Sequence, residues 1–246
     1  MAPDEEFEKQ RALSRIAPGP QGAGFPEWTQ DGVESLTDFF NNTAHLWDQK
    51  FEHRYGTLHQ QVANAIPRTE NPLRILDVGC GTGLELKPIF ERVPNAKVTA
   101  MDQSPQMLDE LARKFALRSP QIELRLASCL EWPADLTGFD VVVSVLCAHH
   151  FDPPTKTQLY GNFRSSLNDN GFYVEGDQIA PAHEETIGLA LYDAWIAKLP
   201  GGTRGEWNYD VTLSLDTNQR LMQDAGFAPT KTEWVGEDHA VLVAHR

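Results

Sequence analysis

Short apolar runs and longer amphipathic stretches alternate along most of the chain, which is typical of an α/β protein. Apolar runs rich in β-branched residues predict strands at 73–78, 97–102, 122–127, 139–145 and 171–177. Helical spacing predicts helices at 84–93, 105–116, 154–168, 184–199 and 215–225. The last two runs, 230–235 and 239–245, predict an antiparallel pair at one edge. We therefore expect a doubly wound, mostly parallel sheet of seven strands.

The first 70 residues lack this alternation, and their sequence predicts two further regions of the protein. Residues 1–30 are charged and then rich in proline and glycine, which favours a flexible arm. Residues 31–70 form a predicted N-terminal helical cover, because apolar side chains recur at helical spacing and indicate two or three helices over 33–66. The α/β domain is expected over 71–246, with a covering insertion at about 184–212.

Composition narrows the classes of function. The chain of 246 residues has a formal net charge of −14, which counts against tight non-specific binding of nucleic acid. No apolar run is long enough to span a membrane, and residues 1–30 do not resemble a signal peptide. The three cysteines are odd in number and lack metal-type spacing, so reduced thiols are expected. These features favour a cytoplasmic protein with a small-molecule partner, and they leave a homodimer open.

The most informative motif joins the first predicted strand to the first predicted helix. Residues 75–83 are Ile-Leu-Asp-Val-Gly-Cys-Gly-Thr-Gly, a strand that ends near Asp77 and opens into a glycine-rich turn. Such turns let the backbone approach a nucleotide-like cofactor at a helix N-terminus. The glycines follow G-x-G-x-G, whereas a dinucleotide fingerprint is G-x-G-x-x-G, and position 84 here is leucine. Because Asp77 would repel a phosphate, we expect a ligand that carries an amine or another cation.

A second acid follows at the spacing expected for ribose recognition. The strand predicted at 97–102 ends in Asp102, nineteen residues after Gly83. A carboxylate there can accept hydrogen bonds from both hydroxyls of a ribose. Ser104 is expected to cap the next helix, which begins with Pro105. The other interpretation of Asp102 is an acid that merely ends a strand.

The segment Asp-Val-Gly-Cys-Gly-Thr-Gly resembles motif I of the class I S-adenosylmethionine-dependent methyltransferases, and the resemblance extends over roughly residues 45–246. It implies a Rossmann-like methyltransferase fold, S-adenosyl-L-methionine as cofactor and S-adenosyl-L-homocysteine as product. Asp77 and the turn backbone would hold the amino-acid end of the cofactor, and Asp102 its ribose. The cofactor-binding residues that the resemblance implies are Asp77, Gly79, Cys80, Gly81, Gly83, Asp102, Gln103, Met107, Ser128, Cys129, Leu130 and Val145.

One position departs from the family pattern. Where the family has an acid that accepts the adenine amino group, this chain has Ser128. A hydroxyl accepts that hydrogen bond more weakly than a carboxylate does. Either Ser128 contacts adenine, with Glu131 as a substitute, or Ser128 caps the strand end and adenine is held by backbone and packing. Met107 and Leu130 are the residues expected to flank the base.

The fourth predicted strand runs into Cys-Ala-His-His-Phe, which contains His149 and His150. Ligands of open α/β sheets lie outside the carboxyl ends of the strands, so this segment is expected to face cofactor and substrate. Imidazole can take a proton near neutral pH, and the segment is similar to a His-His variant among small-molecule methyltransferases of this class. We predict a catalytic or substrate-contacting role and favour His149 as the residue facing the site. Two structural histidines bonded to backbone are the other interpretation.

The fifth predicted strand ends in Asp177 at the same edge. This acid is the third catalytic candidate, because it could orient a substrate amine, pair with a histidine or assist a metal. A helix-capping acid is the alternative. The set His149, His150, Asp177 and His183 has no regular ligand spacing, so no metal is predicted.

Aromatic residues in two segments are candidates for a cover over the substrate. They are Trp47 and Tyr55 in the N-terminal helical region, and Trp207 and Tyr209 in the insertion. Aromatic rings suit an apolar or cationic substrate, and they exclude water from the reacting centre.

These features together predict a methyltransferase that acts on a small-molecule nucleophile by in-line displacement. One alternative is a relative of the enzymes that make or use carboxy-S-adenosylmethionine in tRNA wobble modification. That cofactor would need an arginine near its sulfur, for which Arg54 is the candidate. A non-catalytic cofactor-binding protein is the other alternative. The acceptor atom (O, N, S or C) is left open, because function lies in the site rather than in the fold.

Overall fold

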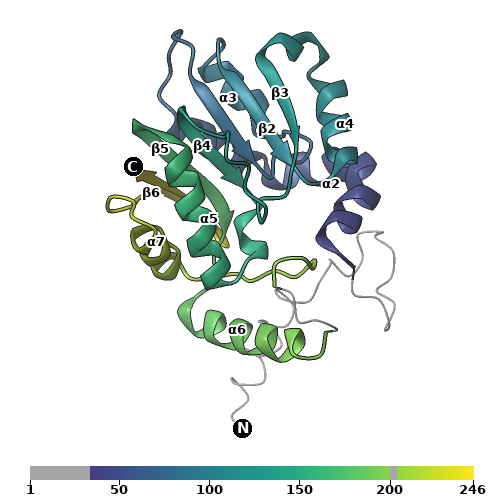
Figure 1. Cartoon of the computed structure of the whole chain (residues 1–246), viewed down its shortest axis with the longest axis vertical. Coiled ribbons are helices and arrows are strands. Elements are labelled where there is room, and N and C mark those ends of the chain that lie inside the picture. The colour runs from purple at the N-terminus through teal and green to yellow at the C-terminus, as the bar shows by residue number, and fades with distance from the viewer. Residues whose placement is uncertain (1–33, 200–203) are drawn as a thin grey trace.

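The computed structural model describes residues 34–199 and 204–246, so the arm predicted at 1–30 lies outside the described residues. Within them, helices cover both faces of one seven-stranded sheet (Figure 1). The strands are β1 (Arg74–Val78), β2 (Lys97–Asp102), β3 (Ile122–Leu126), β4 (Phe139–Val145), β5 (Leu167–Gln178), β6 (Lys231–Val235) and β7 (His239–His245). The helices are α2 (Leu36–Ala65), α3 (Leu86–Arg92), α4 (Pro105–Lys114), α5 (Pro153–Ser166), α6 (Ala182–Ile196) and α7 (Leu215–Asp224). Two short 3-10 helices span Ala116–Gln121 and Ala148–His150.

The strand order is β3-β2-β1-β4-β5-β7-β6. Strands β1 to β5 pair in parallel, and β7 runs antiparallel to both β5 and β6. This confirms the predicted doubly wound, mostly parallel sheet with an antiparallel pair at one edge. From β1 the chain builds outward first to β2 and β3 and then, on the other side, to β4 and β5. Such a switch point opens a crevice at the carboxyl ends of the strands, where open α/β sheets bind ligands.

The N-terminal region forms one helix, so the prediction of two or three helices over 33–66 was wrong. The Ser35 hydroxyl caps α2 by accepting the backbone N–H of Asp38, and the helix then continues for 30 residues. Gly56 lies inside α2, but a glycine inside a helix costs only about 1 kcal/mol. Packing of α2 against α3, α4, β5 and β7 therefore holds one long helix together.

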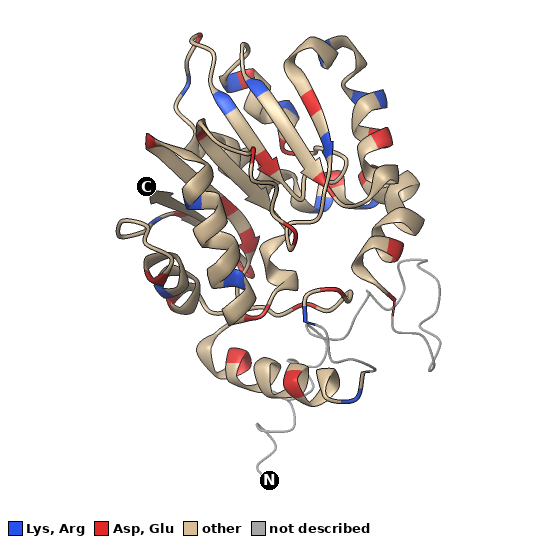
Figure 2. Cartoon of the chain, viewed as in Figure 1, with Lys and Arg blue, Asp and Glu red and all other residues tan. Residues whose placement is uncertain are grey.

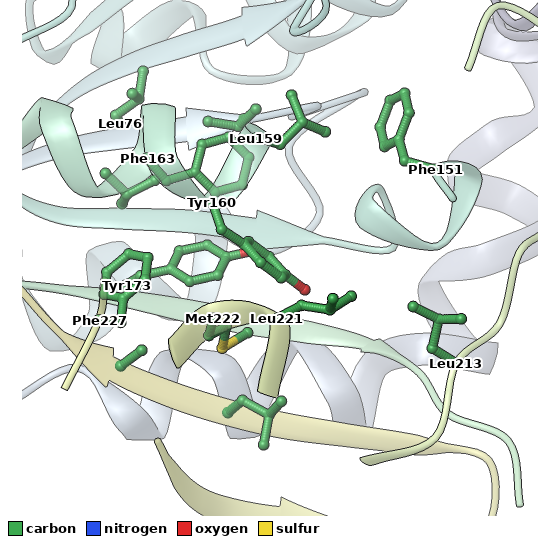
Figure 3. Close-up of a cluster of buried hydrophobic side chains, with 14 of the residues drawn as sticks. Leu76, Phe151, Leu159, Tyr160, Phe163, Tyr173, Leu213, Leu221, Met222 and Phe227 are labelled. Atoms are coloured by element: carbon green, nitrogen blue, oxygen red, sulfur yellow. The ribbon is translucent and has the colours of Figure 1, made fainter. Parts of the chain in front are cut away.

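Two clusters of buried apolar side chains form the core, one on each face of the sheet. One lies between the strands and α2, α3 and α4, and the other lies between the strands and α5, α6 and α7. Figure 3 shows part of the second cluster, in which the rings of Tyr160, Phe163 and Tyr173 pack together. The hydroxyls of Tyr160 and Tyr173 both donate to Glu175 Oε2, at 2.7 and 2.8 Å. This buried carboxylate therefore joins α5 to β5.

The structure also shows where the charged residues lie and how apolar the described helices are. In Figure 2, lysine and arginine residues are scattered over separate elements rather than gathered on one. None of the described helices is both long and apolar enough to cross a bilayer.

Gly176 in β5 provides a test of how closely α2 packs on the sheet. A Cβ atom at this position would lie 2.2 Å from Val62 Cγ2, so Gly176→Ala should force the helix away from the strand. We expect the free energy of unfolding in urea to fall by about 1–3 kcal/mol. The control is Gly161→Ala in α5, where a Cβ meets nothing within 4 Å and stability should rise by about 0.5–1 kcal/mol. Unchanged stability of Gly176→Ala would contradict this close packing.

Candidate active site

A cavity of about 770 Å³, partly open to solvent, lies at the carboxyl ends of β1, β2, β3 and β4. Its walls come from the loops that follow these strands and from one side of α2. The lining residues are Leu36, Phe40, Trp47, Tyr55, His59, Gly79, Cys80, Gly81, Thr82, Leu84, Glu85, Met101, Asp102, Gln103, Met107, Ala127, Cys129, Val145, Leu146, Cys147, His150 and Phe151. The cavity therefore occupies the switch point of the sheet.

The glycine turn has the backbone conformation that its sequence predicts. Gly79, Gly81 and Gly83 all have positive φ, a region that side chains other than glycine rarely adopt. At Gly79 a Cβ atom would also lie 2.3 Å from Cys147 Sγ, in the loop after β4. Glycine at this position thus lets the loops after β1 and β4 approach each other.

Asp102 joins the glycine turn to the loop after β2. Its Oδ2 accepts the backbone N–H of Gly81, and its Oδ1 accepts that of Ser104, both at 2.8 Å. Burial raises the pKa of Asp102, while the backbone N–H bonds act in the opposite direction by favouring the charged form. Each carboxylate oxygen still has lone-pair capacity for a ligand, and Asp102 lines the cavity.

Two buried acids near the turn lack a cationic partner. Asp77, at the end of β1, is fully buried, and within the described residues neither of its carboxylate oxygens makes a hydrogen bond. Glu85 lies next to it and lines the cavity, whereas Asp77 itself is not among the lining residues. Oε1 of Glu85 is likewise unbonded. Burial, together with the neighbouring Glu85 carboxylate, raises the pKa of Asp77 well above its usual value. No lysine or arginine among the described residues lines the cavity, so these walls suit a ligand that carries positive charge.

Helix α2 is held over the cavity by polar contacts with the loops. Thr82 of the glycine turn donates to Asp48 of α2, and the Lys114 ammonium lies 2.6 Å from the same carboxylate. Ser104, at the start of α4, donates to Asn41 at 2.7 Å. These contacts hold an aromatic wall on α2, formed by Phe40, Trp47 and Tyr55, against the cavity.

His149 and His150 lie in the short 3-10 helix that follows β4. His149 Nδ1 is 2.6 Å from Asp177 Oδ1, and the backbone N–H of His149 donates to Asp177 Oδ2 at 3.0 Å. His150 lines the cavity, whereas His149, the residue favoured from the sequence, is not among the lining residues. Asp210 approaches both rings, with its Oδ1 3.6 Å from His149 Nε2 and 3.3 Å from His150 Nδ1.

The two histidines differ in electrostatic environment. Burial by itself would lower the pKa of His149, but the carboxylates of Asp177 and Asp210 outweigh burial and raise it. The pKa of His150 is lowered, first by burial and then by the neighbouring His149. The pKa of Asp177 lies below its usual range although burial opposes this, because His149 favours the charged carboxylate.

The backbone between β4 and the histidines is strained. Leu146 has a φ of 49° although it is not glycine, and it lines the cavity. Its N–H donates to the carbonyl of Gly176 at 2.9 Å, which helps to hold this conformation. Strain of this kind costs about 1–3 kcal/mol and is common at functional sites.

Only some of the predicted cofactor-binding residues line the cavity. Met107 and Cys129 line the cavity, as do Cys80, Gln103 and Val145. Ser128 and Leu130 are not among the lining residues. The Ser128 hydroxyl instead accepts the backbone N–H of Leu130 at 3.2 Å, which matches the interpretation of Ser128 as a capping residue.

The predicted cover residues also separate into two groups. Trp47 and Tyr55 line the cavity, whereas Trp207 and Tyr209 are not among its lining residues. The ring of Tyr209 is buried and stacks on Trp195, with ring centroids 4.7 Å apart. Trp207 forms an isolated bridge with Ser35, next to the start of α2.

Sequence reasoning missed about half of the lining residues, and three of the missed residues near the site matter most for its chemistry. Glu85 follows the last glycine of the turn by two residues, and its position at a helix start could have marked it. Phe40 belonged to the apolar pattern of the first helix but carried no sign of facing a cavity. Asp210 lies 61 residues beyond His149, so only the tertiary structure brings it to the histidines.

Comparison with known proteins points to the methyltransferases, the family that the glycine-turn motif resembles. The family model described as "Methyltransferase domain" matches residues 75–171. These residues run from β1 to β5 and include the glycine turn, Asp102 and both histidines. The matched segment is therefore a methyltransferase domain of the S-adenosylmethionine-dependent type.

Individual members of this family resemble the chain over part of its length. A malonyl-[acyl-carrier protein] O-methyltransferase from Halalkalibacterium halodurans is 32% identical over 150 residues, covering 57% of this chain and 54% of that protein. A trans-aconitate 2-methyltransferase from Rhodococcus jostii is 29% identical over 163 residues, covering 63% and 60%. The chain thus spans between half and two thirds of the length of these two methyltransferases.

Two solved structures share the fold. A putative O-methyltransferase from Nostoc punctiforme superposes with a TM-score of 0.66 at 17% identity, covering 99% of this chain and 68% of that chain. The DhpI structure, a complex with SAH, gives a TM-score of 0.64 at 16% identity and covers 84% of this chain and 92% of DhpI.

Because the Asp77 carboxylate is buried without a hydrogen-bond partner, we predict that it lowers the stability of the ligand-free protein. The folded-state pKa of Asp77 lies above its usual 3.8, so stability falls as the pH rises from about 4 through the raised value. In the ligand-free protein, Asp77→Asn should therefore raise the free energy of unfolding at pH 7 by about 1–3 kcal/mol. The gain should shrink toward pH 4, and denaturant titrations at several pH values measure it. Asp224→Asn, at an exposed site, is the control; equal stability of Asp77→Asn and wild type at pH 7 would contradict the prediction.

Proposed function

We propose that the chain transfers a methyl group from S-adenosylmethionine to a small-molecule nucleophile. The observation that carries this proposal is the pair of buried, unpartnered acids beside a glycine turn at the switch point of the sheet. S-adenosylmethionine, when bound, supplies a methyl group on a positively charged sulfur and also carries an ammonium group. A cavity with two acidic side chains in its wall and no lysine or arginine among its lining residues is suited to such a cation.

The turn and the two strand-end acids would hold the cofactor. Asp77 and Glu85 would bind the ammonium end, because three of their buried carboxylate oxygens make no hydrogen bond among the described residues. Asp102 would accept hydrogen bonds from the ribose hydroxyls with its remaining lone pairs. Met107 and Cys129 would pack against the base.

The aromatic wall of α2 and the histidine pair would hold the acceptor. Phe40, Trp47 and Tyr55 offer apolar ring faces, which attract flat, apolar or cationic molecules. His150 lines the same cavity, and its ring is 5.6 Å from that of Phe40, measured between centroids. We assign the acceptor to the space between this wall and His150, with α2 excluding water.

The chain contributes mainly positioning to the reaction. It would hold the nucleophilic atom of the acceptor in line with the methyl group, at a polar site made by His150, His149 and Asp177. A desolvated cavity favours a step in which positive charge on sulfur is lost. His150 is therefore proposed as the catalytic residue, and His149 and Asp177, which do not line the cavity, are proposed as residues that position it.

Other activities find less support in the geometry. A carboxylated cofactor needs a nearby cation, but Arg54 is not among the cavity-lining residues, and its guanidinium lies 5.2 Å from the ring centroid of Tyr55. The absence of lysine and arginine from the described lining also favours a neutral or cationic acceptor over a carboxylic acid. A cytoplasmic location and a homodimer stay predictions, and light scattering of the purified protein tests the second.

Cofactor binding can be measured without knowing the acceptor. Isothermal titration calorimetry should detect binding of both S-adenosylmethionine and S-adenosylhomocysteine. Asp102→Asn removes a charged acceptor, so the affinity should fall about 10- to 100-fold, equivalent to about 1.4–2.7 kcal/mol. Asp109→Asn, at an exposed position on α4, should bind as wild type does. Failure of the wild-type protein to bind either nucleoside would refute the proposal.

The acceptor class can be found by a screen with a labelled methyl group. Small phenols, thiols, amines and carboxylic acids, together with bulk tRNA, would be offered with tritiated S-adenosylmethionine. We expect transfer to a neutral or cationic small molecule, and transfer to tRNA alone would favour the wobble-modification alternative. Trp47→Ala should raise the KM for that acceptor several-fold and leave kcat less affected, because it removes binding surface rather than reacting groups.

A further inference from the structure

Three donor atoms from two distant segments converge beside the cavity. They are His149 Nε2, His150 Nδ1 and Asp210 Oδ1, and all three lie within 4.8 Å of one another. The Asp210 oxygen is 3.6 Å from the first nitrogen and 3.3 Å from the second. Both distances are long for an N–H···O hydrogen bond, and His150 Nδ1 makes no hydrogen bond among the described residues.

The same distances fit ligands that share one metal ion. Nitrogen and oxygen ligands lie about 2.0–2.2 Å from zinc, so two ligands of a tetrahedral ion are about 3.3–3.5 Å apart. The two measured separations are close to this value. The arrangement is therefore better explained by a common ion than by direct bonds between the side chains.

Asp177 prepares His149 for such a role. It lies 2.6 Å from Nδ1 and can accept a proton carried there, which leaves Nε2, the nitrogen nearer Asp210, to bind an ion. The Asp177 carboxylate is itself fixed by the backbone N–H groups of His149 and Gln178. A carboxylate that orients a histidine from behind is a common second layer of metal sites.

The surroundings of the cluster allow an ion to enter. Both histidines are buried, but the side chain of Asp210 is 31% exposed, which leaves one side of the cluster accessible. The backbone N–H of Val211 donates to the carbonyl of His149, which keeps the Asp210 segment beside the rings. Two carboxylates, Asp177 and Asp210, bring negative charge that a divalent cation would neutralise.

We propose that His149, His150 and Asp210 bind a divalent transition-metal ion, with zinc as the reference metal, and that Asp177 orients His149. Two imidazoles and one carboxylate form a donor set that zinc and its first-row neighbours accept. Three protein ligands leave a coordination position free, and His150 lines the cavity in which the acceptor is proposed to bind. The sequence predicted no metal because His149, His150, Asp177 and His183 lack a regular ligand spacing, and Asp210 was not among the residues considered.

The role of this ion rests on the proposed methyl transfer. A hydroxyl or thiol acceptor in the free coordination position would have its pKa lowered and would release its proton to water. The resulting anion would form a bond to the methyl carbon. The carbon–sulfur bond would break with its electron pair kept by sulfur, which leaves S-adenosylhomocysteine and the methylated acceptor.

Metal binding can be measured directly on the full chain. After treatment with a chelator, the wild-type protein would be dialysed against micromolar Zn²⁺ and its zinc content measured by plasma mass spectrometry. We expect one equivalent of zinc in the wild-type protein. We expect no bound zinc in either His150→Ala or Asp210→Asn. Asp177→Asn should keep this equivalent but bind it about 10- to 100-fold more weakly. Asp216→Asn, an exposed acid on α7, should match the wild type.

Two further measurements separate the possible outcomes. Co²⁺ bound to the wild-type protein should give the visible spectrum of nitrogen and oxygen ligands, and a strong sulfur-to-cobalt band would instead place the ion on cysteine and overturn the proposal. Because the cobalt spectrum is recorded on the wild-type protein, this test does not depend on the folding of any variant. No metal uptake by wild type, or full uptake by His150→Ala and Asp210→Asn, would also overturn it. Calorimetry with S-adenosylmethionine on the same samples tests the methyltransferase proposal separately, because Asp77 and Asp102 lie outside the cluster.

Discussion

The carboxylate of Asp102 holds together the two loops on which the cavity depends. One oxygen accepts the N–H of Gly81 in the turn after β1, and the other accepts the N–H of Ser104 at the start of α4. This side-chain link adds to the backbone hydrogen bonds by which Gly79 and Cys80 donate to the Met101 carbonyl at the end of β2. Because carboxylate oxygens can accept more than one hydrogen bond, Asp102 can serve the fold and the proposed ribose contact together.

The other acids at the site are arranged at a cost to stability. Asp77 and Glu85 are buried close together, and three of their carboxylate oxygens make no hydrogen bond among the described residues. Leu146 adds backbone strain at the end of β4. A fold under selection for stability alone would pair such acids with a lysine or relax such a turn. These features are best understood if the missing positive charge comes from a ligand.

Two segments far from the glycine turn complete the cavity. Helix α2 reaches across from the N-terminal side and is tied down by contacts of Asp48 with Thr82 and Lys114. The segment around Asp210 comes from after α6 and is joined to the histidine loop through Val211. The regular α/β unit thus supplies the proposed cofactor side of the site, while the less regular segments supply the proposed acceptor side. Differences in acceptor within this fold would then arise in these added segments.

The sequence by itself determined the sheet, the glycine turn and the two strand-end acids. These depend on local signals: apolar periodicity, glycine where φ is positive, and an acid at the carboxyl end of a strand. Parallel pairing then brings those ends to one edge, so Asp77, Asp102, His150 and Asp177 could be assigned to one region. Only the tertiary structure decided that α2 is a single helix, because its packing on the sheet outweighs the weak break at Gly56.

The tertiary structure also decided which side chains meet at the site. In it, His150 rather than His149 lines the cavity, and Tyr209 stacks on Trp195 instead of facing the cavity. Asp210 lies near both histidines. No periodicity or spacing encodes these contacts, since they join segments separated by many residues and depend on how whole elements pack. Local pattern therefore determined where a cofactor could bind, and long-range packing determined which groups face the acceptor.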